Sequence, residues 1–259
     1  MLEYQHEDDT KNSPPVVTIS LRQSLSNSAN LPCPVTYEDE YKYLPWGILI
    51  ERIAQWVAQH TPKNSVILDY MCGTGYLLNR LEQLRSDLML LGCSLDEDYI
   101  AYATKKYPKL NIAFQDAMLY KPKKTPNIII CTAGLHHLPI DRQSLFIDKI
   151  AHELPKGAYF LLGEILIREH KDEKCRALAA LELGSTLVSH CLSTGAPESV
   201  TKAAFQVLYN DVFFTDEYKR SCSQIIGMLK KYFSIEKIEQ TWPLDIKEFG
   251  DYLFICKRI

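Results

Sequence analysis

The stretch that decides the fold runs Val66-Ile67-Leu68-Asp69-Tyr70-Met71-Cys72-Gly73-Thr74-Gly75-Tyr76-Leu77-Leu78. An apolar run ends at Asp69, two glycines follow, and a helical pattern begins at Tyr76. Glycine lets a ligand approach the backbone closely, and the first turn of a helix offers N–H groups that have no intrahelical partner. The stretch therefore predicts a strand, a ligand-binding turn and a helix. It lacks the patterns G-x-x-x-x-G-K-[ST] and G-x-G-x-x-G, which argues against a nucleoside triphosphatase and a dehydrogenase.

Apolar strands and helical segments alternate on both sides of this turn. Helices are predicted over residues 46–59, 76–84, 96–107 and 141–154. Asp96 is the predicted N-cap of the third helix and Asp141 of the fourth. Strands are predicted over residues 65–69, 88–94, 111–115, 127–132, 158–166, 235–241 and 252–257. Strands this apolar favour a parallel sheet covered by helices on both faces. The predicted fold class is α/β, a doubly wound, seven-stranded, mostly parallel sheet whose last two strands form an antiparallel hairpin.

Three segments fall outside this alternation. Residues 168–210 predict helices interrupted at 193–197, which is too much helix for a simple crossover, so we expect a helical cap insertion over the C-terminal edge of the sheet. A further helix is predicted over residues 216–232. Residues 1–34 are rich in Ser, Asn, Pro and acidic groups and predict a tail or a lid, with a short strand or helical turn at 16–21. We expect a tail or lid over residues 1–45 and one domain over residues 46–259.

The composition is that of an ordinary globular protein, with 46% hydrophobic residues, 24% charged residues and a formal net charge of -3. No long basic run is present, so we expect no nucleic-acid partner. No apolar run reaches the roughly 18–20 residues of a membrane span, and residues 1–15 lack the features of a secretory signal. The eight cysteines are scattered, without a C-x-x-C pair or a Cys/His cluster at metal-ligand spacing. We expect a cytoplasmic protein that contacts no membrane and holds no metal, and its oligomeric state is open.

Several segments, in chain order, resemble the motifs of class I S-adenosylmethionine (SAM)-dependent methyltransferases of the small-molecule type. Residues 68–75, Leu-Asp-Tyr-Met-Cys-Gly-Thr-Gly, resemble the first cofactor-binding motif. Residues 91–96, 114–117 and 130–138 resemble the motifs at the ends of the second, third and fourth strands. Residues 153–157 resemble the turn before the fifth strand. The resemblance covers roughly residues 46–166.

This resemblance implies that SAM is the cofactor and S-adenosylhomocysteine (SAH) the product. It also implies a set of cofactor-binding residues, namely Asp69, Met71, Cys72, Gly73, Gly75, Ser94, Leu95, Asp116, Ala117, Thr132 and Tyr43. Tyr37, Tyr41 and Trp46 are further aromatic candidates for closing over the cofactor. Met71 stands where the family usually has a small residue, and Ser94 stands where a carboxylate usually binds the ribose hydroxyls. A serine hydroxyl forms weaker hydrogen bonds to a diol than a carboxylate, so these departures bear on cofactor affinity more than on the fold.

Three side chains are candidates for catalysis. His136 and His137 follow the fourth predicted strand, and Glu164 lies near the end of the fifth, so all three are expected at the edge where open α/β sheets bind ligands. A general base is needed when the methyl acceptor holds a proton that it does not lose unaided. Each of the three is a candidate for that base, and each is also explained by loop packing or by shaping of the substrate site.

The predicted function is methyl transfer from SAM to a small, partly apolar metabolite, of the kind made in specialised biosynthesis, by in-line displacement. The signature Asn/Asp-Pro-Pro-Tyr/Phe of amino-methylating nucleic-acid enzymes is missing after the fourth strand, where residues 133–138 read Ala-Gly-Leu-His-His-Leu. The helical insertion suits an organic substrate enclosed in a pocket. Two alternatives stay open. The chain methylates a protein or RNA, or it has lost methyl transfer and binds a ligand or catalyses another reaction.

Overall fold

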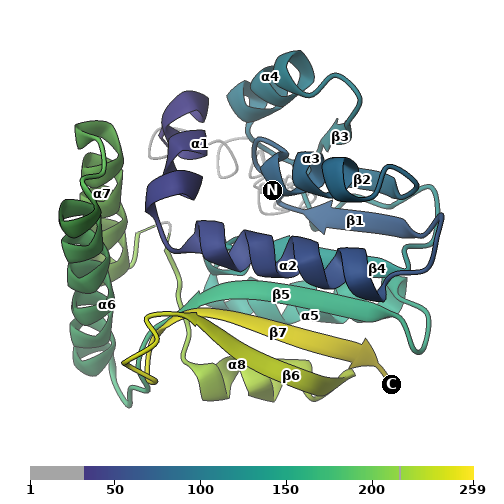
Figure 1. The fold of residues 1–259 in the computed structure, drawn as a ribbon. Helices are drawn as coiled ribbons and strands as arrows, with labels where there is room; N and C mark the ends of the chain where they lie inside the picture. Colours follow the sequence, from purple (N-terminus) through teal and green to yellow (C-terminus); the bar gives the residue numbers. More distant parts are fainter. Residues whose placement is uncertain (1–31, 216) are drawn as a thin grey trace, which may run out of the picture.

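A mixed β-sheet forms the centre of the molecule in a computed structural model that describes residues 32–215 and 217–259 (Figure 1). The strand order is β3-β2-β1-β4-β5-β7-β6, and β7 runs antiparallel to both of its neighbours while the other pairs are parallel. The strands are β1 Val66–Tyr70, β2 Met89–Ser94, β3 Asn111–Phe114, β4 Ile128–Thr132, β5 Tyr159–Leu166, β6 Phe233–Trp242 and β7 Gly250–Arg258. The predicted fold class is confirmed, including the terminal hairpin.

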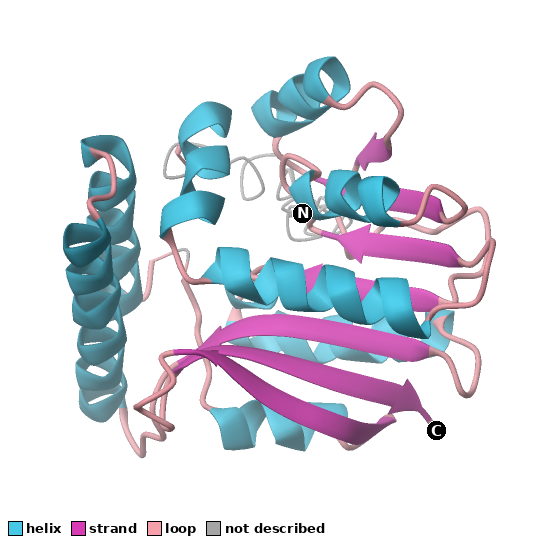
Figure 2. Cartoon of the chain, in the orientation of Figure 1, coloured by secondary structure: helices cyan, strands magenta, loops and turns pink. Residues whose placement is uncertain are grey.

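Helices cover both faces of the sheet, as Figure 2 shows. Their bounds are α1 Pro34–Tyr43, α2 Trp46–His60, α3 Tyr76–Leu84, α4 Glu97–Lys106, α5 Ile140–Glu153, α6 Glu173–Thr194, α7 Glu198–Phe213 and α8 Cys222–Leu229, with a 3₁₀ turn at Leu135–His137. Successive strand residues point to opposite faces, so Ile67 packs in the core under α2 and α3, whereas Leu68 packs in the core under α5 and α8. Both faces of β1 are buried, which explains why its sequence is an unbroken apolar run.

The predicted cap is a hairpin of two helices that stands across the C-terminal ends of the parallel strands (Figure 1). Gly195 ends α6 in the left-handed region with φ of 69°, and Pro197 precedes α7. The two helices lie so close that a Cβ on Gly184 would meet Leu208 Cβ at 2.8 Å. The buried Arg176 side chain donates to the carbonyl oxygens of Asp211 at 2.7 Å and Val212 at 3.0 Å, which caps the end of α7.

Two local predictions are wrong. The helix expected from residue 216 begins only at Cys222. Tyr218 N donates instead to the His136 carbonyl at 2.7 Å and Ile167 N donates to the Arg220 carbonyl at 3.0 Å, so long-range pairing keeps residues 217–221 extended. Ser221 then starts α8 with a capping box. Asp141, the predicted N-cap of α5, lies instead in the first turn of that helix, and Pro139 is the N-cap.

The N-terminal predictions fall largely on residues that the structure leaves out. The short element expected at 16–21, and most of the predicted tail or lid, lie outside the described residues. The remainder of that segment is α1, a helix that begins with Pro34 in its first turn. Among residues 32–215 and 217–259, no helix has the length and apolarity needed to cross a membrane.

Candidate functional site

The glycine turn after β1 lies at the C-terminal edge of the sheet, between β1 and the start of α3. Gly73 and Gly75 adopt φ of +55° and +77°, values that side chains rarely tolerate, and Gly75 is the N-cap of α3. Cys72 N donates to the Cys93 carbonyl at 3.0 Å, which ties the turn to the end of β2. Strand order reverses between β1 and β4, so the turn lies at the switch point where open α/β sheets bind ligands.

Helix α1 covers this turn with aromatic rings. A Cβ on Gly73 would lie 3.1 Å from Tyr37 Cε1, so the tyrosine ring occupies the space that the glycine leaves. Tyr41 stacks on Tyr76 of α3, with ring centroids 4.2 Å apart. Tyr37 also packs against Tyr99 of α4 at 4.8 Å. These contacts make α1 one wall of the site.

Met71 occupies a left-handed backbone position, with φ of 57°. A Cβ in the left-handed region costs backbone strain energy, which the glycine common at this position in the resembled family avoids. Met71 carries that strain in this chain. The side chain turns toward the loop after β4, because a Cβ on Gly134 would meet Met71 Cβ at 3.1 Å. Met71 also packs against the core cluster under α5.

Asp69, near the end of β1, and Thr132, at the end of β4, place buried polar atoms at this edge, although the Thr132 side chain as a whole is only half-buried. Asp69 is 2% exposed, and burial raises its pKa to about 8. The Thr132 hydroxyl oxygen is buried and has no hydrogen-bond partner among the described residues. A buried polar group without a partner is costly, so both positions suit contact with a polar ligand.

The other acidic candidates are engaged in local structure. Asp96 caps α4 by accepting from Tyr99 N at 2.8 Å, as the sequence predicts. Asp116 accepts from Met118 N at 2.8 Å in the turn after β3, next to the buried Ala117. Ser94 is buried at the end of β2, whereas Leu95, beside it, is 37% exposed.

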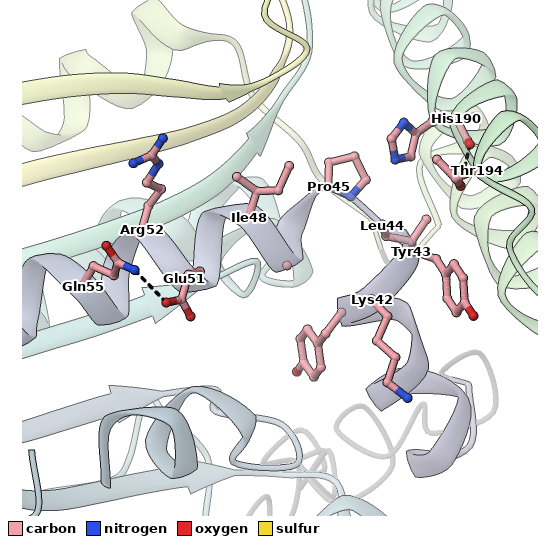
Figure 3. Close-up of a pocket in the computed structure, with 12 residues that line it drawn as sticks. Lys42, Tyr43, Leu44, Pro45, Ile48, Glu51, Arg52, Gln55, His190 and Thr194 are labelled. Carbon is pink, nitrogen blue, oxygen red and sulfur yellow. Dashed lines mark hydrogen bonds between the residues drawn. The ribbon is translucent and has the colours of Figure 1, made fainter. Parts of the chain in front are cut away.

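Tyr43 lies away from the glycine turn, in a groove of about 430 Å³ where α1, the start of α2 and α6 meet. Figure 3 shows Tyr43, Leu44 and Pro45 along one wall and His190 and Thr194 of α6 along the other. Ile48, Glu51 and Arg52 of α2 continue the first wall (Figure 3). The groove thus combines an apolar surface with charged groups.

The three catalytic candidates meet beneath the cap. His136 is 4% exposed in the 3₁₀ turn after β4, and its Nδ1 forms a very short hydrogen bond with Glu164 Oε1 of β5. His136 Nε2 lies 3.3 Å from Glu217 Oε2. His137 Nδ1 lies 3.8 Å from Glu217 Oε1, and its side chain is 40% exposed. Burial lowers the pKa of His136 well below its usual value and raises the pKa of Glu164 to about 7.

Sequence reasoning missed the charged residues that complete this cluster. Lys219 Nζ bonds to Asp211 Oδ1 at 2.8 Å and makes a very short contact with Glu217 Oε2. Asp251 of β7 is 2% exposed, and burial raises its pKa to about 8, with the charge of Glu164 adding to the shift. Asp211, Lys219 and Asp251, but not Glu217, line a crevice between cap and sheet together with Trp46, Ile165 and Trp242. The available signal is the run Glu217-Tyr218-Lys219, in which two charged residues are separated by one position and so lie on the same face of an extended segment.

Comparisons with known proteins agree with this geometry. Residues 67–157 match the family model of a methyltransferase domain. Residues 67–157 thus have the sequence of a methyltransferase domain, and they run from β1 through β4 of the sheet. No protein of curated function matches the sequence at a significant level.

Solved structures with low sequence identity share the fold of this methyltransferase. One is magnesium protoporphyrin IX methyltransferase from Synechocystis PCC 6803 with bound SAM, at 16% identity, covering 82% of this chain and 78% of that chain with a TM-score of 0.53. Another is mycolic acid cyclopropane synthase CmaA1 complexed with SAH and CTAB, at 13% identity, 81% and 84% coverage and a TM-score of 0.59. The plantazolicin methyltransferase BpumL in complex with a triazolic analogue and SAH is similar at 11% identity, 87% and 90% coverage and a TM-score of 0.59.

The residues of this methyltransferase fit the cofactor that its domain type uses. The glycine turn supplies a close-approach backbone, in which Gly73 and Gly75 adopt positive φ and Gly75 begins α3. Asp69 and Thr132 supply buried polar atoms at the ends of β1 and β4. SAM has a charged amino-acid end and a nucleoside end, and this edge of the sheet offers backbone N–H groups and polar side chains for both.

Proposed function

We propose that this methyltransferase transfers a methyl group from SAM to a small, partly apolar metabolite. The observation that supports it is the groove of about 430 Å³ lined by α1, the solvent side of α2 and the cap helix α6. Its volume lies within the range of small-molecule sites, roughly 300–1,000 Å³. Tyr41 lies in both places, because it lines the groove and stacks on Tyr76 beside the glycine turn.

SAM supplies a methyl group on a positively charged sulfur, which leaves as a neutral thioether. The residues of the chain hold the acceptor in line with that methyl group and exclude water. We assign cofactor contacts to Asp69, Gly73, Gly75 and Thr132, and leave Tyr43 to the substrate groove, where its side chain lies. Methyl transfer forms one bond from the acceptor to carbon and breaks one bond between carbon and sulfur.

The acceptor proton is the remaining requirement. A hydroxyl, protonated amine or carbon acceptor loses a proton during transfer, and the charged cluster beneath the cap is the part of the site that can accept or displace it. His136 and Glu164 are joined by a hydrogen bond, and His137 presents its partly exposed side chain beside them. None of the three lines the groove, and His136 and Glu164 are buried. We therefore assign contact with an acceptor that reaches beyond the groove to His137, and the positioning of the histidine pair to His136 and Glu164.

The solved relatives support a small-molecule substrate. They are named for magnesium protoporphyrin IX, mycolic acid and plantazolicin, all of them organic molecules rather than folded macromolecules. The formal net charge of -3 gives this chain no overall attraction for nucleic acid.

Calorimetric titration of the purified chain with SAM and SAH tests the cofactor part of the proposal. We expect micromolar binding of both ligands that is lost in Asp69→Ala, and preserved in the control Asp87→Ala, which removes a half-buried carboxylate paired with Arg85. Absence of binding to either ligand would favour the alternative in which methyl transfer has been lost.

The substrate part is tested by following conversion of labelled SAM. Partly apolar metabolites carrying hydroxyl, amino or activated-carbon groups are compared with total RNA and with unfolded protein. Turnover on RNA or protein, without turnover on any metabolite, would overturn the small-molecule assignment.

A further inference from the structure

Two histidines and one glutamate converge beneath the cap with the spacing of metal ligands. His136 Nε2 lies 3.3 Å from Glu217 Oε2, and His137 Nδ1 lies 3.8 Å from Glu217 Oε1. One ligand atom from each residue can be chosen so that all lie within 4.8 Å of one another. Zinc-like ions bind imidazole nitrogen and carboxylate oxygen at about 2.0–2.2 Å, which places neighbouring ligand atoms roughly 3–3.5 Å apart. Small side-chain shifts bring the triad to that geometry.

The hydrogen bond behind His136 orients its ring for this role. Nδ1 bonds to Glu164 Oε1, which leaves Nε2 facing Glu217. A carboxylate behind a histidine in this way fixes the ring nitrogen that binds a metal. When Nδ1 donates its proton to Glu164, the Nε2 lone pair and the Glu217 carboxylate are two acceptors that face one another. Because Lys219 already contacts Glu217 Oε2, Glu217 Oε1 is the oxygen left to bind a cation beside the two imidazoles.

More carboxylates than cations are buried around the triad. Four of them, those of Glu164, Asp211, Glu217 and Asp251, lie near the buried side chains of Lys219 and Arg176 in the part of the chain that the structure describes. Lys219 contacts Asp211 and Glu217 and so offsets one negative charge. One oxygen each of Glu164, Asp211 and Asp251 has no hydrogen-bond partner among the described residues. A buried surplus of negative charge is costly unless a cation or protons neutralise it.

The geometry points to a divalent first-row transition metal ion bound by His136, His137 and Glu217. Two imidazoles and one carboxylate suit Zn²⁺, Fe²⁺ or Co²⁺ and leave coordination positions open. His137 is the exposed member of the triad, so the open positions face the side from which a ligand arrives. The role of the ion, to bind the methyl acceptor and make its proton easier to lose, rests on the proposed function. Its binding does not.

The expectation that the chain holds no metal came from the absence of ligand spacing in the sequence. Glu217 follows His137 by 80 positions, so no local pattern joins them. The extended segment at 217–221 brings the carboxylate to the histidines, through the hydrogen bond from Tyr218 N to the His136 carbonyl at 2.7 Å.

Titration of the chelator-treated full chain with Co²⁺, followed by visible absorption, tests the site without cofactor or substrate. We expect saturation at one ion per chain, weak d–d bands typical of nitrogen and oxygen ligands, and displacement by Zn²⁺. His137→Ala should weaken binding about tenfold or more, since it removes a ligand from the least buried position. The control His152→Ala removes an exposed histidine of α5 and should leave binding unchanged.

Two results would overturn the metal site. One is no saturable binding to the wild-type chain, or binding that His137→Ala leaves unchanged. The other is an intense near-ultraviolet thiolate band, which would assign the ion to cysteines such as the exposed Cys33. Calorimetry with SAH on the same preparation separates this test from the proposed function, because cofactor binding without metal binding rejects the metal alone.

Discussion

The ring of Tyr37 lies where a side chain on Gly73 would have to go, with Tyr37 Cε1 3.1 Å and its hydroxyl 3.2 Å from the position of a Cβ. Tyr37 belongs to helix α1, and Gly73 belongs to the glycine turn after β1. Helix α1 therefore closes one side of the glycine turn that we propose as the cofactor site, and changes on either side of the contact should alter cofactor binding.

Gly73→Ala should lower both stability and cofactor affinity. Its φ of +55° disfavours any side chain, at a cost of about 1 kcal/mol or more, and the new methyl group presses on Tyr37. The matched control is Gly157→Ala, whose φ is +82° but whose Cβ meets nothing within 4 Å. Thermal unfolding should fall in both variants, whereas calorimetry should show weaker SAH binding only in Gly73→Ala. Equal SAH affinity in the two variants would mean that the contact with Tyr37 does not shape the cradle.

Glu38→Ala should release α1 and speed cofactor dissociation. Glu38 is 7% exposed and accepts from Lys106 Nζ at 2.5 Å and from Tyr107 Oη at 3.0 Å, which fastens α1 to the end of α4. Loss of about 1 kcal/mol from this tether corresponds to a roughly fivefold faster release of SAH. Stopped-flow fluorescence measures that rate, and hydrogen exchange over residues 34–43 should also become faster.

Asp39→Ala is the control for this prediction, because Asp39 pairs only within α1, with Lys42 Nζ at 2.7 Å. It removes a carboxylate from the same helix without touching α4. If both variants release SAH at the wild-type rate, α1 does not hold the cofactor in place.

Asp69→Asn should stabilise the cofactor-free protein at neutral and alkaline pH. Burial raises the pKa of Asp69 to about 8, above the value of about 3.9 in an unfolded chain, so the folded state holds the proton more tightly. The favourable contribution is complete below pH of about 4 and is lost as the pH rises through about 8. The melting temperature of the variant should therefore match the wild type near pH 4 and exceed it by pH 8.

The same variant should bind SAH less well, so stability and function move in opposite directions at this position. If the difference in melting temperature between the variant and the wild type is the same from pH 4 to pH 9, the pKa of Asp69 is not raised by folding. The melting temperature of Asp116→Ser is the comparison, because Asp116 is a half-buried carboxylate that accepts a hydrogen bond from Met118 N at 2.8 Å.

Local sequence patterns predict most of the fold because the strands, turns and helix ends are specified by residues that are close together in the chain. The apolar run at β1, the glycines of the turn and the Gly195–Pro197 break between α6 and α7 each leave a short signature. The segment at 217–221 was assigned to a helix because its partners, His136 and Ile167, lie far away in the chain. Long-range backbone pairing overrode the local preference there.

The site divides in the same way. The sequence placed His136, His137 and Glu164 at one edge, because parallel strands end together. It did not indicate Glu217 or Lys219, whose burial depends on a tertiary contact. The family resemblance implies a cofactor contact for Tyr43, which stays a prediction, and the structure places its side chain in the groove beside α6.

Met71→Gly should tighten cofactor binding at little cost in stability. The φ of 57° at Met71 stores about 1 kcal/mol of backbone strain that glycine does not have. Against this gain stands the lost packing of a half-buried side chain on Gly134 and the greater freedom of glycine in the unfolded chain. These effects are of similar size, so the melting temperature should change little. The cradle widens between the turn and the loop after β4, and calorimetry should show a severalfold lower Kd for SAH.

Asn64→Gly is the control that separates strain from space. Asn64 has a φ of 61° in an exposed turn before β1, so the substitution relieves a similar backbone conformation without changing the cradle. Its Kd for SAH should equal that of the wild type. If Met71→Gly weakens SAH binding while Asn64→Gly does not, the methionine side chain forms part of the cofactor site, and its departure from the family pattern is a contact that this methyltransferase uses.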